Sequence, residues 1–471
     1  MASVVFPPFA LVGVLIIGFF ENLNISIHKI NNEQSIDFSS YSVKEWKYLP
    51  TVITITTIFY FSVLILIDIR NNYIPKKNLR KNINKIKREQ NKIINENKDV
   101  YKEYISVKKN VSDYAVCMVN LYLERKVNYS KNNKAFQKLI NEENKVYYYD
   151  DIHESNYGKS TCFVKTIINY VTFGVNKQEC FCILGPKGSG KTSLLDMITK
   201  LILPTDGKIY LNGIDSNNYQ IENLSISYCT QKETYWKYLN LSHQIEYELK
   251  LRGFTSKDVK TYSKQYIQYF DLEKIKKTKM NLLDDTVKRM VKFIMTICSK
   301  TDIIVLDEPT VGMDVKSREI IWETLQQIQK NRPNTTIIIA TSSFEEARNL
   351  GDRIGILVNG CLKCVGTPEE LEKNYCQRYI LKVQSESIPE FQQKIMKESH
   401  LFDDDYIIED EFNTWITYNI SLQQTIGTVF DVIEQYKSSG LVTEYSFSRL
   451  TLKQLYLNYA KYQVVIDNTN E

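Results

Sequence analysis

The sequence predicts an α/β fold built around a buried sheet, and three stretches carry this prediction. An apolar run of strand length, 179–184, leads into the glycine-rich stretch 185–192, and helical spacing follows it. A second apolar run ends in two carboxylates within 303–308. A third run, 335–340, has the composition of another buried strand. Buried strands that alternate with helical stretches are typical of an α/β domain.

The glycine-rich stretch fits the pattern G-x-x-x-x-G-K-[ST] and lies between a predicted strand and a predicted helix, the context of a phosphate-binding loop. Glycines let the backbone N–H groups turn inward toward phosphate oxygens, and the helix N-terminus adds partial positive charge. Lys191 would reach the β- and γ-phosphates, and the Thr192 hydroxyl would bind Mg²⁺. The alternative is a glycine-rich turn that carries a lysine by chance, which both flanks disfavour. The predicted ATP-binding residues here are Gly185, Pro186, Lys187, Gly188, Ser189, Gly190, Lys191, Thr192 and Ser193.

The carboxylates at the end of the second run complete the predicted nucleotide site. Asp307 would hold Mg²⁺, directly or through water, and Glu308 would be the catalytic residue that orients and polarises the attacking water. The residues themselves therefore predict Thr192 and Asp307 as metal ligands, and the expected cofactors are ATP and Mg²⁺.

Composition limits the other possibilities. The chain has 471 residues, of which 43% are hydrophobic and 24% are charged, enough for two to four domains. A net charge of +5 is weak evidence for nucleic acid as a partner. The nine cysteines form no paired framework, and the pair Cys361 and Cys364 has no second pair or histidine cluster nearby, which disfavours zinc. We expect reduced thiols that face the cytosol.

Residues 1–70 are predicted to hold membrane segments. The uncharged run 2–20 contains two adjacent prolines and is expected to be bent or re-entrant. The run 49–67 is the better transmembrane candidate. A basic block follows it directly, so the positive-inside rule places the chain from residue 70 onward in the cytosol, where this block can also contact anionic lipid. The block comprises Arg70, Lys76, Lys77, Arg80, Lys81, Lys85, Lys87 and Arg88.

Three cytosolic parts are expected after the membrane segments. Residues 71–145, rich in lysine and asparagine, are predicted to be a linker with some helix, and 146–375 the nucleotide-binding domain. In the tail, 376–471, apolar patterning predicts the order β-α-β-β-α-β, which is ferredoxin-like, and then a closing helix. Within the nucleotide-binding domain, the expected elements are strands at 146–149 and 163–175, a hairpin at 209–213, helices at 243–252 and 259–270, and a capped helix that begins at Thr367.

Together these motifs resemble an ATP-binding-cassette (ABC) transporter, and subfamily A in particular. The stretch 226–231 resembles the Q-loop, and 303–308 the Walker B strand, with Asp314 matching the D-loop. The Q-loop resemblance implies that Gln231 binds the nucleotide, is a third metal ligand and couples the site to the membrane domain; the alternative is a surface glutamine. Further similarity to subfamily A is found at 6–9, 345–354, 359–368 and 382–385. Because it includes several motifs spread over nearly the whole chain, the resemblance is specific.

The resemblance implies partners and a place in the cell. Such transporters have two membrane halves and two nucleotide-binding domains, and their substrates are mostly lipids. This chain looks like the last membrane segments, the second nucleotide-binding domain and the regulatory domain. It is then a fragment or a subunit, whose partners are the other nucleotide-binding domain, the remaining membrane domains and the lipid bilayer.

Two departures from the family pattern place ATP turnover in doubt. The family's signature loop, Leu-Ser-Gly-Gly, corresponds to Leu283 followed by Asp284, Asp285 and Thr286. Carboxylates at this position would face the negatively charged triphosphate. In water, each pair of like charges ~4 Å apart would oppose binding by about 1 kcal/mol. The switch histidine corresponds to Ser342, which cannot supply the same reach. Sequence drift and a deliberately degenerate site both account for these losses.

Three functional hypotheses follow. The first is an active transport ATPase. The second is a module that binds ATP without hydrolysing it, or a non-functional fragment. The third, a soluble cassette ATPase that acts on DNA or ribosomes, is disfavoured by the run 49–67 and the ferredoxin-like tail. An aromatic residue usually stacks on adenine in this family, and Tyr157 is a candidate that competes with 147–149.

Overall fold

The computed structural model forms two compact units, residues 1–84 and 85–471. It describes residues 61–66, 97–128, 153–155, 162–216, 225–232, 234–298, 301–385, 387–397, 402, 406–412, 414–422, 424–461 and 463. The apolar run 2–20 lies outside these residues, and so does 49–67 except for the helical stretch 61–66. Among the described residues, no helix has both the length and the apolar character needed to span a membrane.

The second unit is organised around a six-stranded sheet in the order β11-β10-β4-β9-β8-β7. Adjacent strands from β10 to β7 run parallel, and only β11 is antiparallel to its neighbour. The strands are β4 (Cys180–Leu184), β7 (Ile226–Cys229), β8 (Ile303–Asp307), β9 (Thr336–Thr341), β10 (Arg353–Val358) and β11 (Cys361–Gly366). The apolar runs at 179–184, 303–308 and 335–340 thus form neighbouring strands, as the sequence predicts.

Both faces of this sheet are buried, which explains why its strands are apolar throughout. In β4 the side chains of Cys180, Cys182 and Leu184 belong to one hydrophobic core, and those of Phe181 and Ile183 to another. The first core packs against the helical part of the unit and the second against an antiparallel sheet. The phosphate-loop strand is therefore held from both sides.

The antiparallel sheet has the order β2-β3-β1-β5-β6. Its strands are β1 (Tyr114–Asn128), β2 (His153–Ser155), β3 (Cys162–Asn176), β5 (Asp206–Leu211) and β6 (Ile214–Asp215). β3 confirms the strand predicted at 163–175. The hairpin predicted at 209–213 is also confirmed, with Asn212 and Gly213 at φ values of 48° and 80°, as a tight two-residue turn requires.

The stretch predicted as a linker with some helix, 71–145, contains a helix at 98–109 and also a long strand at 114–128 that the prediction did not include. α5 (Lys98–Lys109) packs onto β3 and β11, and β1 pairs with β3 on one side and β5 on the other. Asp99 of α5 accepts a hydrogen bond from the Val365 N–H at 3.0 Å, and Glu103 forms an ion pair with Arg353 at 2.6 Å. The surrounding lysines and asparagines conceal a nearly continuous apolar run, 114–123, that is interrupted only by Asn120.

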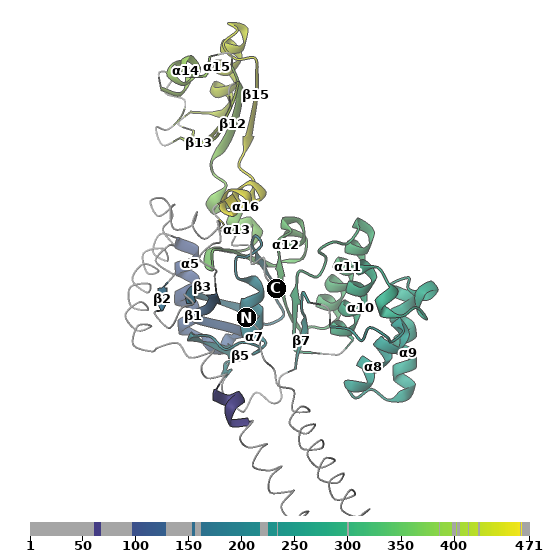
Figure 1. Ribbon diagram of the computed structural model, residues 1–471. Coiled ribbons are helices and arrows are strands. Elements are labelled where there is room, and N and C mark those ends of the chain that lie inside the picture. The colour runs from purple at the N-terminus through teal and green to yellow at the C-terminus, as the bar shows by residue number, and fades with distance from the viewer. Residues whose placement is uncertain are drawn as a thin grey trace, which may run out of the picture. The chain divides into compact units, whose positions relative to one another are not determined.

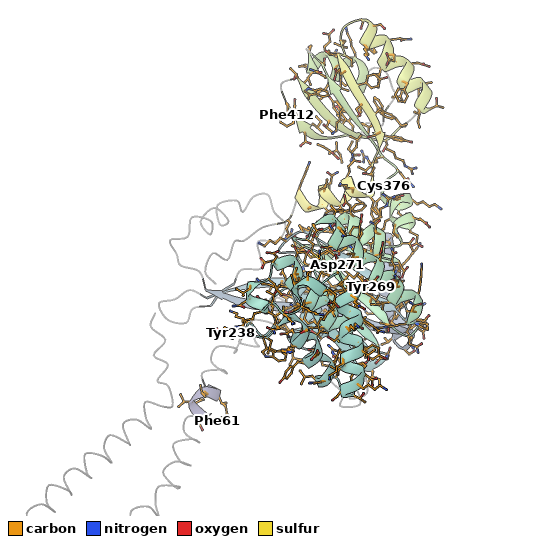
Figure 2. The ribbon with its side chains drawn as sticks, turned by 90° about the vertical axis from the view of Figure 1, so that its right-hand side faces the viewer. Phe61, Tyr238, Tyr269, Asp271, Cys376 and Phe412 are labelled. Carbon is orange, nitrogen blue, oxygen red and sulfur yellow. The ribbon has the colours of Figure 1, made fainter. Side chains whose placement is uncertain are left out.

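Helices gather on one side of the sheets, where Figure 1 shows α8 to α11. The helices are α7 (Lys191–Ile198), α8 (Leu241–Leu251), α9 (Ser256–Tyr269), α10 (Asp285–Ile297), α11 (Val315–Asn331), α12 (Phe344–Leu350) and α13 (Pro368–Tyr375), with short 3₁₀ turns at Val111–Asp113, Glu273–Ile275 and Met280–Leu282. α8 and α9 confirm the predictions at 243–252 and 259–270. The helix start at Thr367 is confirmed by a full capping box with Glu370. Figure 2 shows the exposed rings of Tyr238 and Tyr269 on the helical side.

The C-terminal part contains a four-stranded antiparallel sheet in the order β13-β14-β12-β15. Along the chain come β12 (Tyr379–Gln384), α14 (Ile388–Phe391) continued by a π-helical turn (Gln392–Lys397), β13 (Ile407–Glu411), β14 (Trp415–Ile420), α15 (Ile426–Ser438), β15 (Glu444–Arg449) and α16 (Leu452–Lys461). Its own core includes Leu381, Phe391 and Tyr418. Phe412, labelled in Figure 2, is exposed between β13 and β14.

Candidate nucleotide-binding site

The glycine-rich loop joins the buried strand β4 to α7, and its glycines occupy positions that other residues could not. Gly190 has a φ of 102°, and a Cβ there would lie 2.7 Å from the Ile168 side chain. At Gly185, a Cβ would lie 2.4 Å from the carbonyl oxygen of Leu357. The loop is also braced by the Gly360 N–H, which donates to the Ser189 carbonyl at 3.0 Å. The sequence therefore shapes a fixed, tightly curled loop ahead of the helix N-terminus.

Lys191, the first residue of α7, is 6% exposed and bound at several points. Its ammonium group donates to the carbonyl oxygens of Gly185, at 2.7 Å, and Pro186, at 3.1 Å. It also forms an ion pair with Glu308, with 3.2 Å between Nζ and Oε1. The structure thus brings together the predicted phosphate-binding lysine and the predicted catalytic carboxylate.

Asp307, the last residue of β8, is 1% exposed, and neither of its carboxylate oxygens has a hydrogen-bond partner. Burial raises its pKa to about 6, and the charge of Glu308 adds to this, whereas the nearby Thr192 hydroxyl and Lys191 ammonium act in the opposite direction. Unpartnered buried carboxylate oxygens are rare in native proteins. A carboxylate beside a threonine hydroxyl provides the oxygen donors that Mg²⁺ prefers, so these residues fit a magnesium ion.

This carboxylate yields a prediction about stability. Because its folded-state pKa is raised from 3.8 to about 6, the ionised form destabilises the ligand-free fold above pH 6, and the cost disappears as pH falls below 4. Asp307→Asn should therefore stabilise the ligand-free chain at pH 7.5, by about 2–3 kcal/mol at most. Thermal unfolding at pH 7.5 and 4.5 measures this. A stabilisation of equal size at both pH values would contradict the assignment.

Glu308 follows β8 in a left-handed conformation, with a φ of 48°, which is uncommon for a residue with a long side chain. Its N–H donates to the Ala340 carbonyl at 2.8 Å, which fixes its backbone to β9. Its Oε2 atom accepts hydrogen bonds from Ser342, from N–H at 3.2 Å and from the hydroxyl at 3.0 Å. Ser342 therefore holds the Glu308 carboxylate by direct contact, a role that the sequence did not reveal.

The degenerate signature loop still forms the start of a helix. Asp284 is the N-cap residue of α10, and Asp285 is its first residue. The Asp285 side chain is 83% exposed and pairs with Lys288 at 2.9 Å, a hydrogen bond that lowers its pKa. One face of α10 is buried in the core. As predicted from its apolar spacing, the helix persists although the serine and glycines are absent.

A groove connects the start of α10 with the carboxylate pair. Gln231 is exposed in this groove, so the structure brings it to the same hollow as Asp307 and Glu308. Two cations of α10 fix its walls: Arg289 donates to the Glu308 carbonyl at 3.3 Å, and Lys292 to the Thr230 hydroxyl at 2.7 Å. The lining residues are Cys229, Thr230, Gln231, Lys232, Tyr235, Asp285, Lys288, Arg289, Lys292, Asp307, Glu308 and Pro309.

Asp314, predicted to match the D-loop, lies at the N-terminus of α11. Asp314 caps α11 by accepting a hydrogen bond from the Ser317 N–H at 3.1 Å. Tyr157 and the residues 147–149, the candidates for stacking on adenine, lie outside the described residues. One feature was missed: Glu346 of α12, fully buried, accepts a hydrogen bond from Thr310 at 2.8 Å. Glu346 lies in a helix that also buries Phe344, Ala347 and Leu350, but a glutamate by itself gives no sequence signal of burial.

Comparison with known proteins gives a family. The sequence profile of the ABC transporter family matches residues 168–311, which include the glycine-rich loop and the carboxylate pair. Over 327 residues, the chain is 28% identical to the Rattus norvegicus protein named "Cholesterol transporter ABCA5". Over its nucleotide-binding region the chain is therefore similar to ABC transporters of subfamily A. The match to the rat transporter covers 68% of this chain and 20% of the relative.

Other subfamily A relatives agree. The chain is 24% identical over 306 residues to the Mus musculus "Glucosylceramide transporter ABCA12", covering 64% of this chain and 12% of that protein. It is 26% identical over 322 residues to the human "ATP-binding cassette sub-family A member 10", covering 66% and 21%. This chain therefore spans about a fifth or less of the length of these relatives. A solved structure titled as the ATP-binding cassette MJ0796 bound to ADP and Pi aligns with a TM-score of 0.42 at 20% identity, over 54% of this chain and 98% of that one.

Proposed function

We propose that this chain binds Mg²⁺·ATP as the nucleotide-binding domain of a subfamily A transporter. The observation that carries the proposal concerns the Asp307 carboxylate. It is buried, has no hydrogen-bond partner and lies beside Thr192. Thr192, Asp307 and, across the groove, Gln231 would hold the metal. Bound Mg²⁺ would neutralise charge on the β- and γ-phosphates.

The phosphate loop would bind the triphosphate with its own backbone and one side chain. The N–H groups of residues 187, 188 and 190–193 would donate to phosphate oxygens, at a helix N-terminus that favours negative charge. Lys191 would exchange the carbonyls of Gly185 and Pro186 for phosphate oxygens. The tightly curled loop that Gly185 and Gly190 permit supports this assignment.

Glu308 would then act on the attacking water. Once Lys191 turns toward phosphate, Oε1 of Glu308 is available to accept a hydrogen bond, while Ser342 continues to hold Oε2. Water oriented in this way attacks the γ-phosphorus, and ATP and water yield ADP and phosphate. The serine at the switch position supports slow rather than fast turnover, since its short side chain is fully engaged with the carboxylate.

The relatives support the wider part of the proposal. Two of them are named as transporters of cholesterol and of glucosylceramide, so we propose a lipid as the cargo. Residues 2–20 and 49–67 would lie in the bilayer, with the nucleotide-binding domain in the cytosol. The remaining membrane domains and a second nucleotide-binding domain would be partners. The element order and antiparallel sheet of residues 379–449 support a ferredoxin-like regulatory domain.

A second candidate is a module that binds ATP without hydrolysing it. Asp285 favours it, because its exposed carboxylate stands at the start of α10, where the family signature would approach the ATP held by the opposite domain. Two acidic residues at the N-terminus of this helix would repel the negatively charged ATP. The repulsion would act on ATP bound by the partner domain, and it leaves ATP binding by the present chain intact.

The metal assignment is tested by the pH dependence of ATP binding. Because Mg²⁺ and a proton compete for Asp307, Mg²⁺-dependent ATP affinity should fall as pH drops through about 6. Equilibrium binding of a fluorescent ATP analogue to the full chain, from pH 5 to 8 with Mg²⁺ or with EDTA, measures this effect. Asp307→Asn is the matched variant, and it should lose most of the Mg²⁺ dependence. An affinity that does not respond to Mg²⁺ in the parent chain would refute the proposed site.

A further inference from the structure

The apolar side chains of α16, the last helix of the described chain, pack on the nucleotide-binding core, whereas its polar residues Asn458 and Lys461 contact β13 of the C-terminal sheet. Leu452, Leu455 and Tyr456 of α16 are buried in the same hydrophobic cluster as Leu306 and Ile339, the residues next to the carboxylate pair and in the neighbouring strand. α16 lies against α13, where both are labelled in Figure 1, and against β10. α16 therefore belongs to the hydrophobic core that supports the strands of the nucleotide site.

Tyr456 connects this helix to the loop that follows β9. Its side chain is 7% exposed, and its hydroxyl donates a hydrogen bond to the carbonyl oxygen of Ser342 at 3.2 Å. Burial raises the pKa of Tyr456 to about 12, and the charge of Glu308 adds to this, so the phenol stays protonated and remains a donor at physiological pH. The two residues are 114 positions apart in the sequence.

The contact continues into the site through Ser342. The carbonyl of Ser342 is held by Tyr456, whereas its N–H and hydroxyl both donate to Oε2 of Glu308. The other oxygen of Glu308 faces Lys191 at 3.2 Å. One polar chain thus runs from the C-terminal helix to the phosphate-binding lysine, and Ser342 is its central link.

We propose that Tyr456 is a positioning residue for ATP hydrolysis, which acts through Ser342 to hold the Glu308 carboxylate in the orientation that leaves Oε1 toward the phosphates. The inference rests on the proposed function, because it assumes that Glu308 orients the attacking water. By this proposal the C-terminal helix is a component of the hydrolytic site. Ser342 stands where the family has a histidine, and it depends on the hydrogen bond from Tyr456.

The test compares two tyrosines of one helix. In Tyr456→Phe the ring is kept and the donor is lost, so the loop that carries Ser342 gains freedom. We expect kcat for ATP to fall about fivefold, the size expected for one hydrogen bond, while KM and ATP affinity stay unchanged, since Tyr456 touches no phosphate-binding group.

Tyr459→Phe is the matched control: Tyr459 is partly buried against the same cluster, and its hydroxyl has no hydrogen-bond partner among the described residues. It should change kcat less than twofold. Single-turnover cleavage of γ-labelled ATP by the full chain measures both variants.

A double-mutant comparison separates positioning from simple stabilisation. If Tyr456 acts through Ser342, the effect of Tyr456→Phe on kcat should shrink in the Ser342→Ala background. Equal effects in both backgrounds, or an unchanged kcat in Tyr456→Phe with a lowered melting temperature, would overturn the inference and leave the proposed function standing. A parent chain that binds Mg²⁺·ATP but never cleaves it would also overturn the inference alone. Failure of the parent chain to bind Mg²⁺·ATP would refute the proposed function itself.

Discussion

Lys191→Ala should weaken ATP binding by about 10- to 100-fold. The lysine is the buried cation of the loop, and charge-assisted hydrogen bonds to phosphate contribute about 1.5–3 kcal/mol. The change also leaves the Glu308 carboxylate without its ion-pair partner at the phosphate-facing oxygen, so the site becomes more negative. Equilibrium binding of a fluorescent ATP analogue to the full chain in the presence of Mg²⁺ provides the measurement.

Lys187→Ala is the matched control for this experiment. Lys187 lies in the same loop and would contact phosphate only through its backbone N–H, which alanine retains; its charged side chain is exposed, so Lys187→Ala should change affinity only slightly. If Lys191→Ala binds ATP as tightly as the parent chain, the loop is not the phosphate-binding element. Equal losses in the two variants would indicate a general effect of charge rather than a specific contact.

Glu308→Gln should lower the rate of ATP cleavage by about 100-fold or more while ATP remains bound. An amide cannot orient and polarise water as a carboxylate does, and the loss of a general base costs 10²–10⁴-fold. The amide also ends the ion pair with Lys191, which leaves the lysine free for phosphate, so ATP affinity should rise or stay equal. Single-turnover cleavage and equilibrium binding separate the two effects.

An exposed acid close to the site offers the control. Glu345, in the first turn of α12, is exposed, and Glu345→Gln should leave both cleavage and binding unchanged. Cleavage that survives in Glu308→Gln would assign the water-orienting role to another group. Equal, negligible cleavage in the parent chain and in both variants, with ATP bound by all three, would favour the non-hydrolysing module.

Much of the nucleotide site follows from local patterns in the sequence. The glycine loop and the carboxylate pair each lie within a few residues of an apolar strand, and adjacent parallel strands bring their carboxyl ends to one edge of the sheet. This is why Lys191, Asp307 and Glu308 meet as predicted. The start of α10 likewise follows from apolar spacing, which is retained although Asp284 and Asp285 replace the signature residues.

Other features depend on contacts between distant segments, which a single sequence does not record. The hydrogen bond from Tyr456 to Ser342 joins α16 to the loop after β9. In the sequence, all the strands of the C-terminal sheet lie between these two residues. The hydrogen bond from Ser342 to the Glu308 carboxylate goes together with a left-handed backbone conformation at Glu308. No local sequence pattern predicts this conformation for a glutamate. β1 was missed because lysines and asparagines around it dominate the composition, although residues 114–123 are apolar except for Asn120.

The position of α5 and β1 has a practical consequence for dissecting the protein. A piece cut to begin near residue 140 would leave β3 and β5 with open edges where β1 paired with both, and such edges promote aggregation. It would also deprive Arg353 of its closest acidic neighbour, Glu103. Biochemical work on an excised cassette should start its reading frame ahead of Lys98, so that insolubility caused by the cut is not mistaken for loss of nucleotide recognition.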